Sequence, residues 1–447
     1  MNKKLLLSIL LLSGTLALSS CSLFNDDDIM EPNIFNPQYD EPEVVPPGTP
    51  IIDGVAEKDA PEAAGEGTKV FKNVGYAPYD ELNDRFYITN TYKVGGSHHM
   101  GYNINSGNDY YDATSYKNNY DLYVPSSSKT PRNQKHIVIL FIHGGAWTMG
   151  VKTDVNPYIH DFASKGYITA TIKYTLLRNE MDDPSLSIFR NLDEIDACIK
   201  SIKNSLATLG FDTSKTQLVI GGASSGAHLA MLYAYSRGKE SALPIKFVVD
   251  GVGPVDIKPG AWKKFNNDSG EVLDAGLDKN AIAVQESANN LSPLKIIDGG
   301  EDTKYWDNYE TFRIANGMCG MPYSLAEVEE AKTNPNAASY LDITAEGHGE
   351  DQLSVTYWIN KADEASKFPI ICAYAGLDFV VGINQFATLQ KALDAANITY
   401  YSKPDDNVNG YIYFRNSKHE EITKENDEEN YDRLIYAVDS WCQAETI

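Results

Sequence analysis

Short apolar runs alternate with longer amphipathic stretches through most of the chain. The runs are continuously apolar and too short for helices, which predicts strands buried on both faces of a sheet. Strands that alternate with helices predict an α/β fold with a mostly parallel central sheet flanked by helices. The predicted strands are 120–124, 137–142, 167–173, 217–220, 247–249, 368–374 and 411–414, and the predicted helices are about 155–165, 188–209, 227–237, one beginning near 384, and 429–442.

The predicted strand at 217–220 leads into a serine flanked by glycines. Gly222, Ser224 and Gly226 form a G-x-S-x-G motif between that strand and a predicted helix. A serine in a sharp strand-to-helix turn has an exposed Oγ, and the glycines remove the Cβ atoms that would clash in so tight a bend. Ser224 is therefore the candidate nucleophile.

A second glycine turn follows the predicted strand at 137–142. It reads His143, Gly144, Gly145, Ala146 and Trp147. The carboxyl ends of parallel strands lie at one edge of a sheet, where the sites of open α/β folds are found. The two turns therefore suit a single active site.

The two motifs together resemble those of the α/β-hydrolase superfamily, in its esterase and lipase branch with an HGG-type oxyanion loop. The resemblance covers roughly residues 110 to 445. It implies that the backbone N–H groups of Gly144, Gly145 and Ser225 bind the developing oxyanion. One such donor is worth about 3 to 4 kcal/mol. Ala146 departs from the HGGG form of lipases, while the two glycines before it are present.

A serine hydroxyl needs a base that is itself oriented by a carboxylate, and the superfamily places these groups in the order Ser, Asp or Glu, His. Asp378 follows the predicted strand at 368–374 within a G-x-D-x-x-V sequence that matches the superfamily's acid loop. We therefore assign Asp378 as the orienting acid. Asp250, after the strand at 247–249, is the alternative. Asp378 alternatively serves only as a turn or N-cap residue of the next helix.

Two of the eight histidines remain as candidates for the base once those in or before the catalytic turns and in predicted helices are set aside. They are His348 and His419, and only His419 follows Asp378. It lies between the last strand and the closing helix, as the superfamily's base does, so we assign it as general base and keep His348 as the alternative. The following Glu420 is expected to raise the pKa of the imidazole. A plain exposed loop histidine is the other interpretation.

Length and charge narrow the function further. A chain of 447 residues with 42% hydrophobic content is long enough to bury a large core. The formal net charge of −24 argues against nucleic acid or an anionic membrane surface as a partner, because binding polyphosphate needs clustered Lys and Arg.

The first twenty residues have the layout of a secretory signal. Lys3 and Lys4 precede an apolar stretch at 5–18 that is too short for a comfortable membrane span. The sequence from Leu18 to Cys21 matches the bacterial lipobox, which implies lipidation of Cys21 and a membrane anchor. We expect a bacterial cell-envelope lipoprotein, periplasmic or surface-exposed. A plain signal peptide with an incidental cysteine is the alternative.

Residues 21–70 are predicted to form a disordered acidic and Pro-rich linker, since this composition buries too little surface to fold. The acidic run at 26–28 resembles the surface-export tags of some Gram-negative lipoproteins, or serves only to solvate the linker. The hydrolase domain is predicted at 71–447, with an irregular Tyr-, Gly- and Asn-rich stretch at 71–116.

A cap is predicted at about 259–367, between the strands that precede the two candidate acids. Its aromatic residues either line an acyl- or sugar-binding pocket or form the cap's own core. They are Trp262, Phe265, Tyr305, Trp306, Tyr309, Phe312, Tyr323, Tyr340, Tyr357 and Trp358.

Four further cysteines, Cys198, Cys319, Cys372 and Cys442, have spacings that suit neither a zinc site nor a small disulfide scaffold. We expect no metal and no cofactor.

The sequence predicts a serine carboxylic-ester hydrolase that acts on small esters or deacylates polysaccharide. The ester assignment comes from the resemblance, because the same triad cleaves amides and peptides. A serine peptidase or amidase of the same fold and a non-catalytic surface binding protein are the alternatives.

Overall fold

The computed structural model describes four stretches of the chain. They are 48–76, 118–177, 187–257 and 317–447, apart from scattered positions within 322–346, Phe379 and 403–409. The chain divides into Met1–Thr49 and a compact unit, Pro50–Ile447. Cys21, the signal peptide and most of the predicted linker lie outside the described residues.

The compact unit begins about twenty residues before the predicted domain boundary at 71. Residues 51–75 contain a small hairpin, β1 (Ile51–Ile52) and β2 (Val55–Ala56), followed by β3 (Lys58–Asp59) and β4 (Lys69–Gly75). Both β3 and β4 belong to the main sheet. The prediction of a linker up to residue 70 and of an irregular segment from 71 was therefore wrong at this junction. The composition of residues 21–70 as a whole is acidic and Pro-rich, so it gave no indication of the few apolar side chains around Val70. These side chains are buried when β4 pairs in the sheet.

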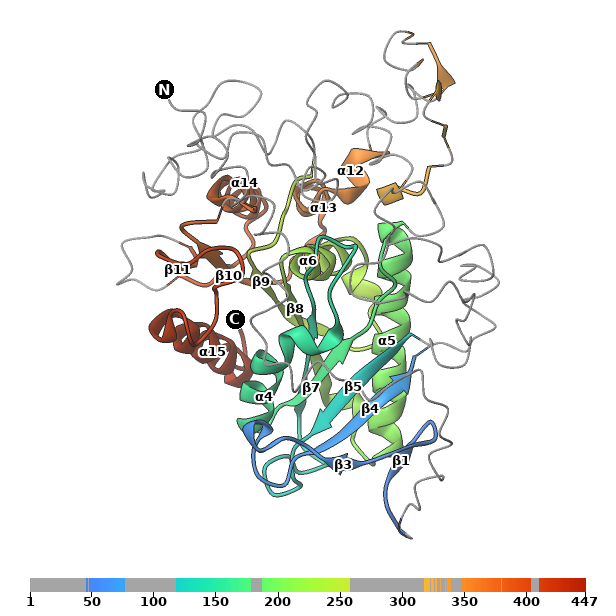
Figure 1. The fold of residues 1–447 in the computed structure, drawn as a ribbon, viewed down its shortest axis with the longest axis vertical. Helices are drawn as coiled ribbons and strands as arrows, with labels where there is room; N and C mark the ends of the chain where they lie inside the picture. The colour runs from blue at the N-terminus through green and yellow to red at the C-terminus, as the bar shows by residue number, and fades with distance from the viewer. Residues whose placement is uncertain are drawn as a thin grey trace, which may run out of the picture. The chain divides into compact units, whose positions relative to one another are not determined.

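Seven further strands complete the main sheet: β5 (Asn119–Val124), β6 (His136–Ile142), β7 (Ile168–Ile172), β8 (Thr216–Ala223), β9 (Ile245–Gly251), β10 (Ile370–Ala375) and β11 (Ile412–Phe414). The order across the nine strands is β11-β10-β9-β8-β6-β7-β5-β4-β3, which Figure 1 shows from β11 at the left to β3 at the lower right. Neighbours from β11 to β7 are parallel, and β5, β4 and β3 continue the sheet antiparallel. The predicted mostly parallel sheet is confirmed.

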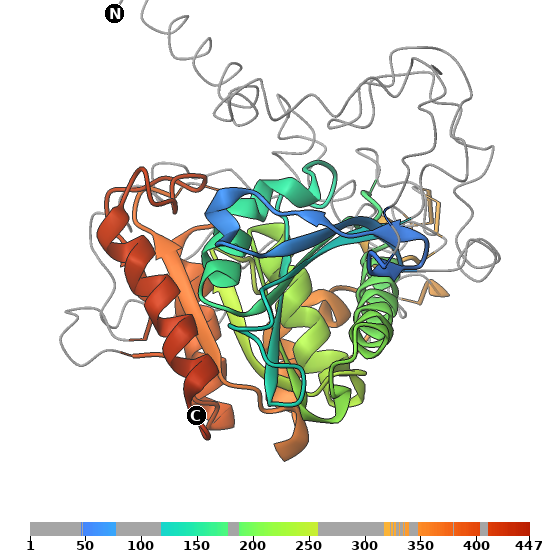
Figure 2. The ribbon, with the colours of Figure 1, turned by 90° about the horizontal axis from the view of Figure 1, so that it is seen from below.

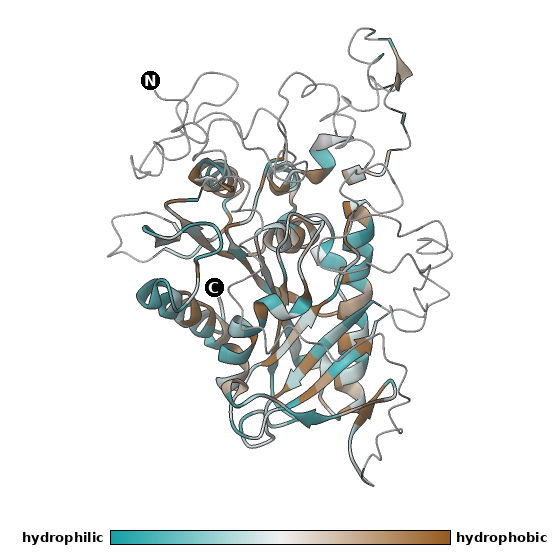
Figure 3. Ribbon diagram, viewed as in Figure 1, coloured by the Kyte–Doolittle hydropathy of each residue, from teal (hydrophilic) through white to brown (hydrophobic). Residues whose placement is uncertain are grey.

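In the described parts of the compact unit, the helices are α4 (Asn156–Ser164), α5 (Ile188–Thr208), α6 (Ser225–Arg237), α12 (Glu350–Leu353), α13 (Val355–Lys361), α14 (Ile383–Ala396) and α15 (Glu428–Gln443). Short 3-10 turns are η1 (Glu62–Ala64), η2 (Lys152–Val155), η4 (Thr213–Lys215), η5 (Gly238–Glu240) and η7 (Glu364–Ser366). Helices α5, α6, α13 and α14 pack into one core, and α4 and α15 pack into a second. Figure 2 shows α5 and α15 on either side of the strands. In Figure 3 both helices are banded in polar and apolar colours, as amphipathic surface helices are.

The two cores explain the continuous apolar run of β6. Val138 and Leu140 face one core, and Ile139 and Phe141 face the other. A parallel strand covered on both faces therefore needs apolar residues at every position. The carboxyl ends of these buried strands remain free to carry polar groups.

The predicted cap is described only in its last part. Helices α12 and α13 return the chain to the sheet, and Trp358 packs against the core of α5, α6 and α14. The indole N–H of Trp358 donates to the carbonyl of Gln352 at 3.0 Å, which favours a core role for this aromatic residue. The aromatic residues predicted at 262–312 and Tyr340 lie outside the described residues.

Candidate active site

Ser224 occupies the sharp turn between β8 and α6. Its backbone has φ 54° and ψ −125°, a left-handed conformation that costs a residue with a Cβ on the order of 1 to 3 kcal/mol. Two hydrogen bonds hold it: Ser224 N–H donates to the carbonyl of Gly251 at 2.7 Å, and its own carbonyl accepts from His228 N–H at 3.1 Å. The strained turn points to a functional role for the serine.

The two glycines of the motif let this turn pack directly on the end of β6. A Cβ at Gly226 would lie 2.2 Å from the carbonyl oxygen of Ile142 and 2.4 Å from that of His143. A Cβ at Gly222 would lie 2.4 Å from the carbonyl carbon of Gly226. No side chain fits either position, so the glycines bring the serine turn against the strand that carries the second turn.

The second turn, His143 to Trp147, lies beside the nucleophile. A Cβ at Gly144 would come within 3.0 Å of the Cβ of Ser224. Gly145 has φ 114°, and a Cβ there would meet the carbonyl of Met149 at 2.2 Å. Within the described part of the chain, the N–H groups of Gly144 and Gly145 donate to no backbone carbonyl. Ser225, the first residue of α6, likewise has an N–H that its helix does not satisfy.

His143 is buried beneath this turn and shapes it. Its ring stacks on Tyr174 with centroids 4.4 Å apart, and Tyr174 Oη donates to the carbonyl of His143 at 3.2 Å. Burial lowers the pKa of His143 to about 4, so the ring is neutral at pH 7. Its Nδ1–H then donates to the carbonyl of Gly144 at 2.8 Å. His143 supplies a hydrogen bond to the turn and no charge.

One histidine connects Ser224 to Asp378. His419 Nε2 lies 2.8 Å from Ser224 Oγ, and His419 Nδ1 lies 2.6 Å from Asp378 Oδ2. The side chain of Asp378 is fully buried, and that of His419 is 14% exposed. The structure therefore brings together the three residues assigned from the sequence, with the histidine between the serine and the carboxylate as in a serine triad.

The acid and base loops are fixed to each other as well as to the sheet. Asp378 Oδ1 accepts N–H groups from Val380 and Val381, both at 2.8 Å, which leaves Oδ2 for the histidine. Leu377 N–H donates to the carbonyl of Ser417 at 3.0 Å. These bonds orient the carboxylate, so that the imidazole has one favoured ring position.

The pKa of His419 results from opposing effects. Burial lowers it, while the charge of Asp378, the hydrogen bond to Asp378 and the charge of Glu420 raise it, and the net pKa lies above the ordinary 6.5. Glu420 acts in the direction expected from its position beside the histidine.

The alternative acid and base lie apart from this arrangement. Asp250 is buried in β9, where Oδ2 accepts from Tyr374 Oη and Oδ1 from Gly253 N–H, both at 2.8 Å. Burial raises the pKa of Asp250 to about 7. His348 is exposed in the loop before α12. Since His419 contacts both Ser224 and Asp378, neither alternative is needed to complete the triad geometry.

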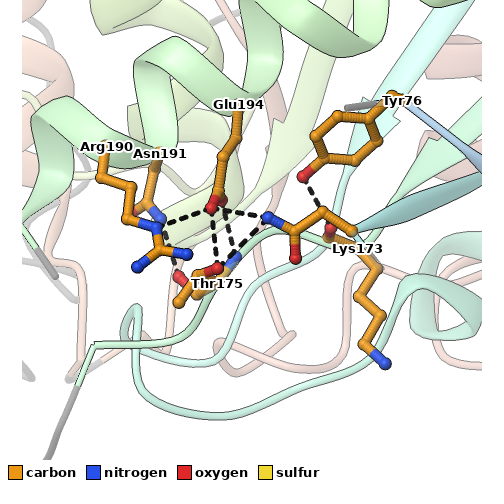
Figure 4. A network of polar contacts seen from close by, with 7 residues as sticks. Tyr76, Lys173, Thr175, Arg190, Asn191 and Glu194 are labelled. Carbon is orange, nitrogen blue, oxygen red and sulfur yellow. Dashed lines mark hydrogen bonds and ion pairs between the residues drawn. The ribbon is translucent and has the colours of Figure 1, made fainter. Parts of the chain in front are cut away.

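A buried polar network around Glu194 was not predicted (Figure 4). Glu194 of α5 accepts from Arg190 Nε at 2.8 Å and from Thr175 N–H at 2.7 Å. Two residues after Thr175, Leu177 N–H donates to the carbonyl of Trp147 at 2.8 Å. The i, i+4 spacing of Arg190 and Glu194 was the available sequence signal.

Among the described residues, no group of three or more His, Cys, Asp or Glu is arranged to hold a metal ion. Cys198, Cys319, Cys372 and Cys442 are buried, and no two of them are joined by a disulfide. No helix in the described stretches has the length and hydropathy that crossing a membrane requires.

Comparisons with known proteins agree with these features. The family model described as BD-FAE matches residues 120–303, which include both glycine turns but neither Asp378 nor His419. A non-reducing polyketide synthase of Penicillium rubens is 28% identical over 151 residues, which are 33% of this chain and 6% of that protein. The chain thus spans a small part of that relative.

Among solved structures, esterase B from Lactobacillus rhamnosis is 15% identical, with a TM-score of 0.46, and the match covers 85% of this chain and 87% of that one. An esterase from the archaeon Pyrobaculum calidifontis is 12% identical, with a TM-score of 0.44, over 73% of this chain and 81% of that one.

Proposed function

Since the chain is an esterase-type α/β-hydrolase, we propose that it cleaves carboxylic esters through an acyl-enzyme formed on Ser224. The observation that carries the proposal is the position of His419, within hydrogen-bond distance of both Ser224 and Asp378. A nucleophile, a base and an orienting acid in one chain of contacts are what acyl transfer requires.

In the first half-reaction, Ser224 Oγ attacks the acyl carbon while His419 Nε2 takes its proton. The imidazolium that forms is stabilised by Asp378, which stays ionised. The oxyanion accepts hydrogen bonds from the N–H groups of Gly144, Gly145 and Ser225. Collapse of the tetrahedral intermediate breaks the ester C–O bond, and His419 donates its proton to the leaving alcohol.

In the second half-reaction, a water molecule takes the place of the alcohol. His419 removes a proton from it as its oxygen attacks the acyl carbon, and the same N–H groups hold the second oxyanion. The acid is released when the bond to Ser224 Oγ breaks and His419 returns the proton to the serine. This cycle needs no cofactor.

We further propose that the esters are acyl groups on polysaccharide and that the protein is anchored in the bacterial envelope through Cys21. The lipobox-like sequence ending at Cys21 and the aromatic residues of 259–367 support this substrate and location. A membrane anchor would keep the enzyme at the cell while it acts on large substrates outside the cell.

Initial-rate hydrolysis of p-nitrophenyl acetate and butyrate by the purified protein tests the reaction. Ser224→Ala should abolish turnover and labelling by a fluorophosphonate probe. Ser236→Ala, at the other end of α6, should retain both. Turnover or labelling that survives in Ser224→Ala would rule out the assigned nucleophile, and cleavage of peptide but not ester substrates would favour the peptidase alternative.

A second assay tests the substrate. Acid released from an acetylated polysaccharide is compared with that from the same material after alkaline deacetylation. Activity on p-nitrophenyl esters with no acid released from the acetylated polymer would contradict the polysaccharide proposal and leave the esterase proposal intact.

A further inference from the structure

A buried imidazole outside the triad contacts three parts of the site. His228 lies on α6 one helical turn after the nucleophile, is fully buried, and donates its backbone N–H to the carbonyl of Ser224 at 3.1 Å. Its ring contacts Trp147, at the end of the second glycine turn, and the carbonyl of Leu353, at the end of α12. The nucleophile helix, the oxyanion turn and the last part of the predicted cap therefore meet at one side chain.

The hydrogen bonds fix the tautomer of this ring. Trp147 Nε1 lies 3.3 Å from His228 Nδ1, and an indole N–H is only a donor, so Nδ1 must accept. His228 Nε2 then carries the proton and donates to the carbonyl of Leu353 at 2.9 Å. Burial lowers the pKa of His228 to about 4, so the ring is neutral at pH 7. Both ring nitrogens are satisfied without charge.

The His143–Trp147 turn has a strained backbone that other contacts must stabilise. Ala146 and Trp147 have φ values of 50° and 63°, an uncommon conformation for residues with a Cβ. Two contacts hold Trp147 in place: its carbonyl accepts from Leu177 N–H at 2.8 Å, and its indole donates to His228. The proposed oxyanion donors Gly144 and Gly145 directly precede these two residues. A shift of the indole would therefore move the donors.

We propose that His228 and Trp147 are positioning residues for the oxyanion turn, and that the carbonyl of Leu353 ties their arrangement to the last part of the predicted cap. This inference rests on the proposed ester hydrolysis. It assigns the indole–imidazole hydrogen bond a role in the transition state, where the oxyanion exists, and little role in binding the ground-state ester.

Trp147→Phe tests the proposal, because it removes the N–H and keeps an aromatic ring in the buried space. With p-nitrophenyl acetate, kcat should fall about 10- to 100-fold, as expected when donors are displaced rather than deleted, and KM should change little. The inhibition constant of a trifluoromethyl ketone, which forms an oxyanion on the serine, should rise by a similar factor. The pH midpoint of His419 should not move. Trp441→Phe, on α15 against Phe247 and Tyr401, is the matched control and should leave all four values unchanged.

His228→Gln provides a second test. Its amide keeps a donor for the carbonyl of Leu353 but does not place an acceptor where Nδ1 lies, so it should reproduce the kinetic effects of Trp147→Phe. If both act through one hydrogen bond, the double variant should be no slower than the slower single variant.

The outcomes separate this inference from the proposed function. A wild-type protein that neither hydrolyses esters nor reacts with a fluorophosphonate overturns the proposed function, and this inference with it. A wild-type protein that is active, with Trp147→Phe unchanged in kcat and in ketone inhibition, overturns only this inference. So does a variant in which kcat falls while ketone affinity is kept, because that result indicates a purely structural role.

Discussion

His419 Nδ1 lies 2.6 Å from Asp378 Oδ2, and this contact determines the pH at which the triad can work. Only a neutral imidazole can take the proton of Ser224. Burial opposes protonation of His419, but the neighbouring carboxylates outweigh it and raise its pKa above 6.5. The contact with Asp378 therefore orients His419 and also keeps it protonated, and so inactive as a base, up to a higher pH.

The first prediction concerns pH. We expect kcat/KM to rise with pH to a midpoint above 6.5, because His419 must lose its proton to act. Glu420→Gln should lower that midpoint, since one of the charges that raise the pKa of His419 is lost. Glu445→Gln, an exposed change near the C-terminus, should not. The profile of kcat/KM against pH checks this, and a midpoint below 6.5 in the wild type would contradict it.

The free energy of unfolding should fall as pH rises through the pKa of His419, whereas kcat/KM should rise. The pKa of His419 is raised in the folded protein, so the stabilisation from its protonated form is fully present below 6.5 and lost as pH rises through the folded pKa. Urea denaturation of wild type and Asp378→Asn at pH 6 and pH 9 measures this. The difference between the two proteins that arises from the charged pair should shrink at the higher pH.

Asp378→Asn should lower kcat by about 10⁴-fold with the fold retained, since an amide stabilises the wrong imidazole tautomer. Asp250→Asn, the matched change at the rejected acid, should leave kcat within about tenfold. Hydrolysis assays with circular dichroism on both variants check this. A larger loss at Asp250 than at Asp378 would reverse the assignment of the acid.

Asp250→Asn should also stabilise the protein at high pH. The pKa of Asp250 is raised to about 7, so ionising this carboxyl costs stability as pH rises from about 4 through 7. The full shift corresponds to an upper limit of about 4 kcal/mol. An asparagine can still accept from Gly253 N–H and donate to Tyr374 Oη, whose own hydrogen can go to the carbonyl of Gly253. Urea midpoints should favour the variant more at pH 8 than at pH 5, and an equal difference at both values would contradict the raised pKa.

Gly226→Ala should prevent stable folding or cost several kcal/mol, because its Cβ would lie 2.2 Å from a backbone carbonyl oxygen that cannot move away cheaply. Gly210→Ala calibrates the experiment: that site has φ 81° and open space around it, so only backbone strain of about 1 kcal/mol applies. Thermal unfolding of both proteins decides. Similar melting temperatures for the two would indicate that the β8–α6 turn adapts.

Glu194→Ala should cost about 3 to 5 kcal/mol, because it removes a buried carboxylate that accepts hydrogen bonds from Arg190 Nε and from Thr175 N–H. Glu429→Ala removes the same i, i+4 partner from Arg433 on α15, where the glutamate is 84% exposed, and should cost under about 1 kcal/mol. Urea denaturation gives both values. Equal losses would indicate that the buried network contributes no more than a surface pair.

The pattern of apolar runs was sufficient to predict the strands from β5 to β11 and the helices α4, α5, α6, α14 and α15, but not α12 and α13. These strands are buried on both faces, so their hydrophobicity is continuous and local. The structure brings Ser224, Asp378 and His419 together because each follows a strand end, and parallel strands place those ends at one edge of the sheet. Their catalytic roles remain a proposal for the assays above.

Two side-chain contacts around the oxyanion turn could not be predicted from the sequence. The stack of His143 on Tyr174 and the bond between Trp147 and His228 join positions 31 and 81 residues apart, and no local pattern specifies such pairs. The strands at 50–70 were missed because of their composition. Few of their residues are apolar, and the strand β4 is stabilised by pairing with β5 rather than by its own composition.

The base lies just beyond β11, a three-residue strand at the edge of the sheet. Edge elements open locally at lower free energy than central strands do. A brief detachment of β11 from β10 would carry His419 away from Ser224 and leave the rest of the sheet intact. On heating, activity should therefore be lost some degrees below the temperature at which the helical circular dichroism signal is lost. The lifetime of the active enzyme would then depend on the detachment of β11 at the sheet edge rather than on unfolding of the core.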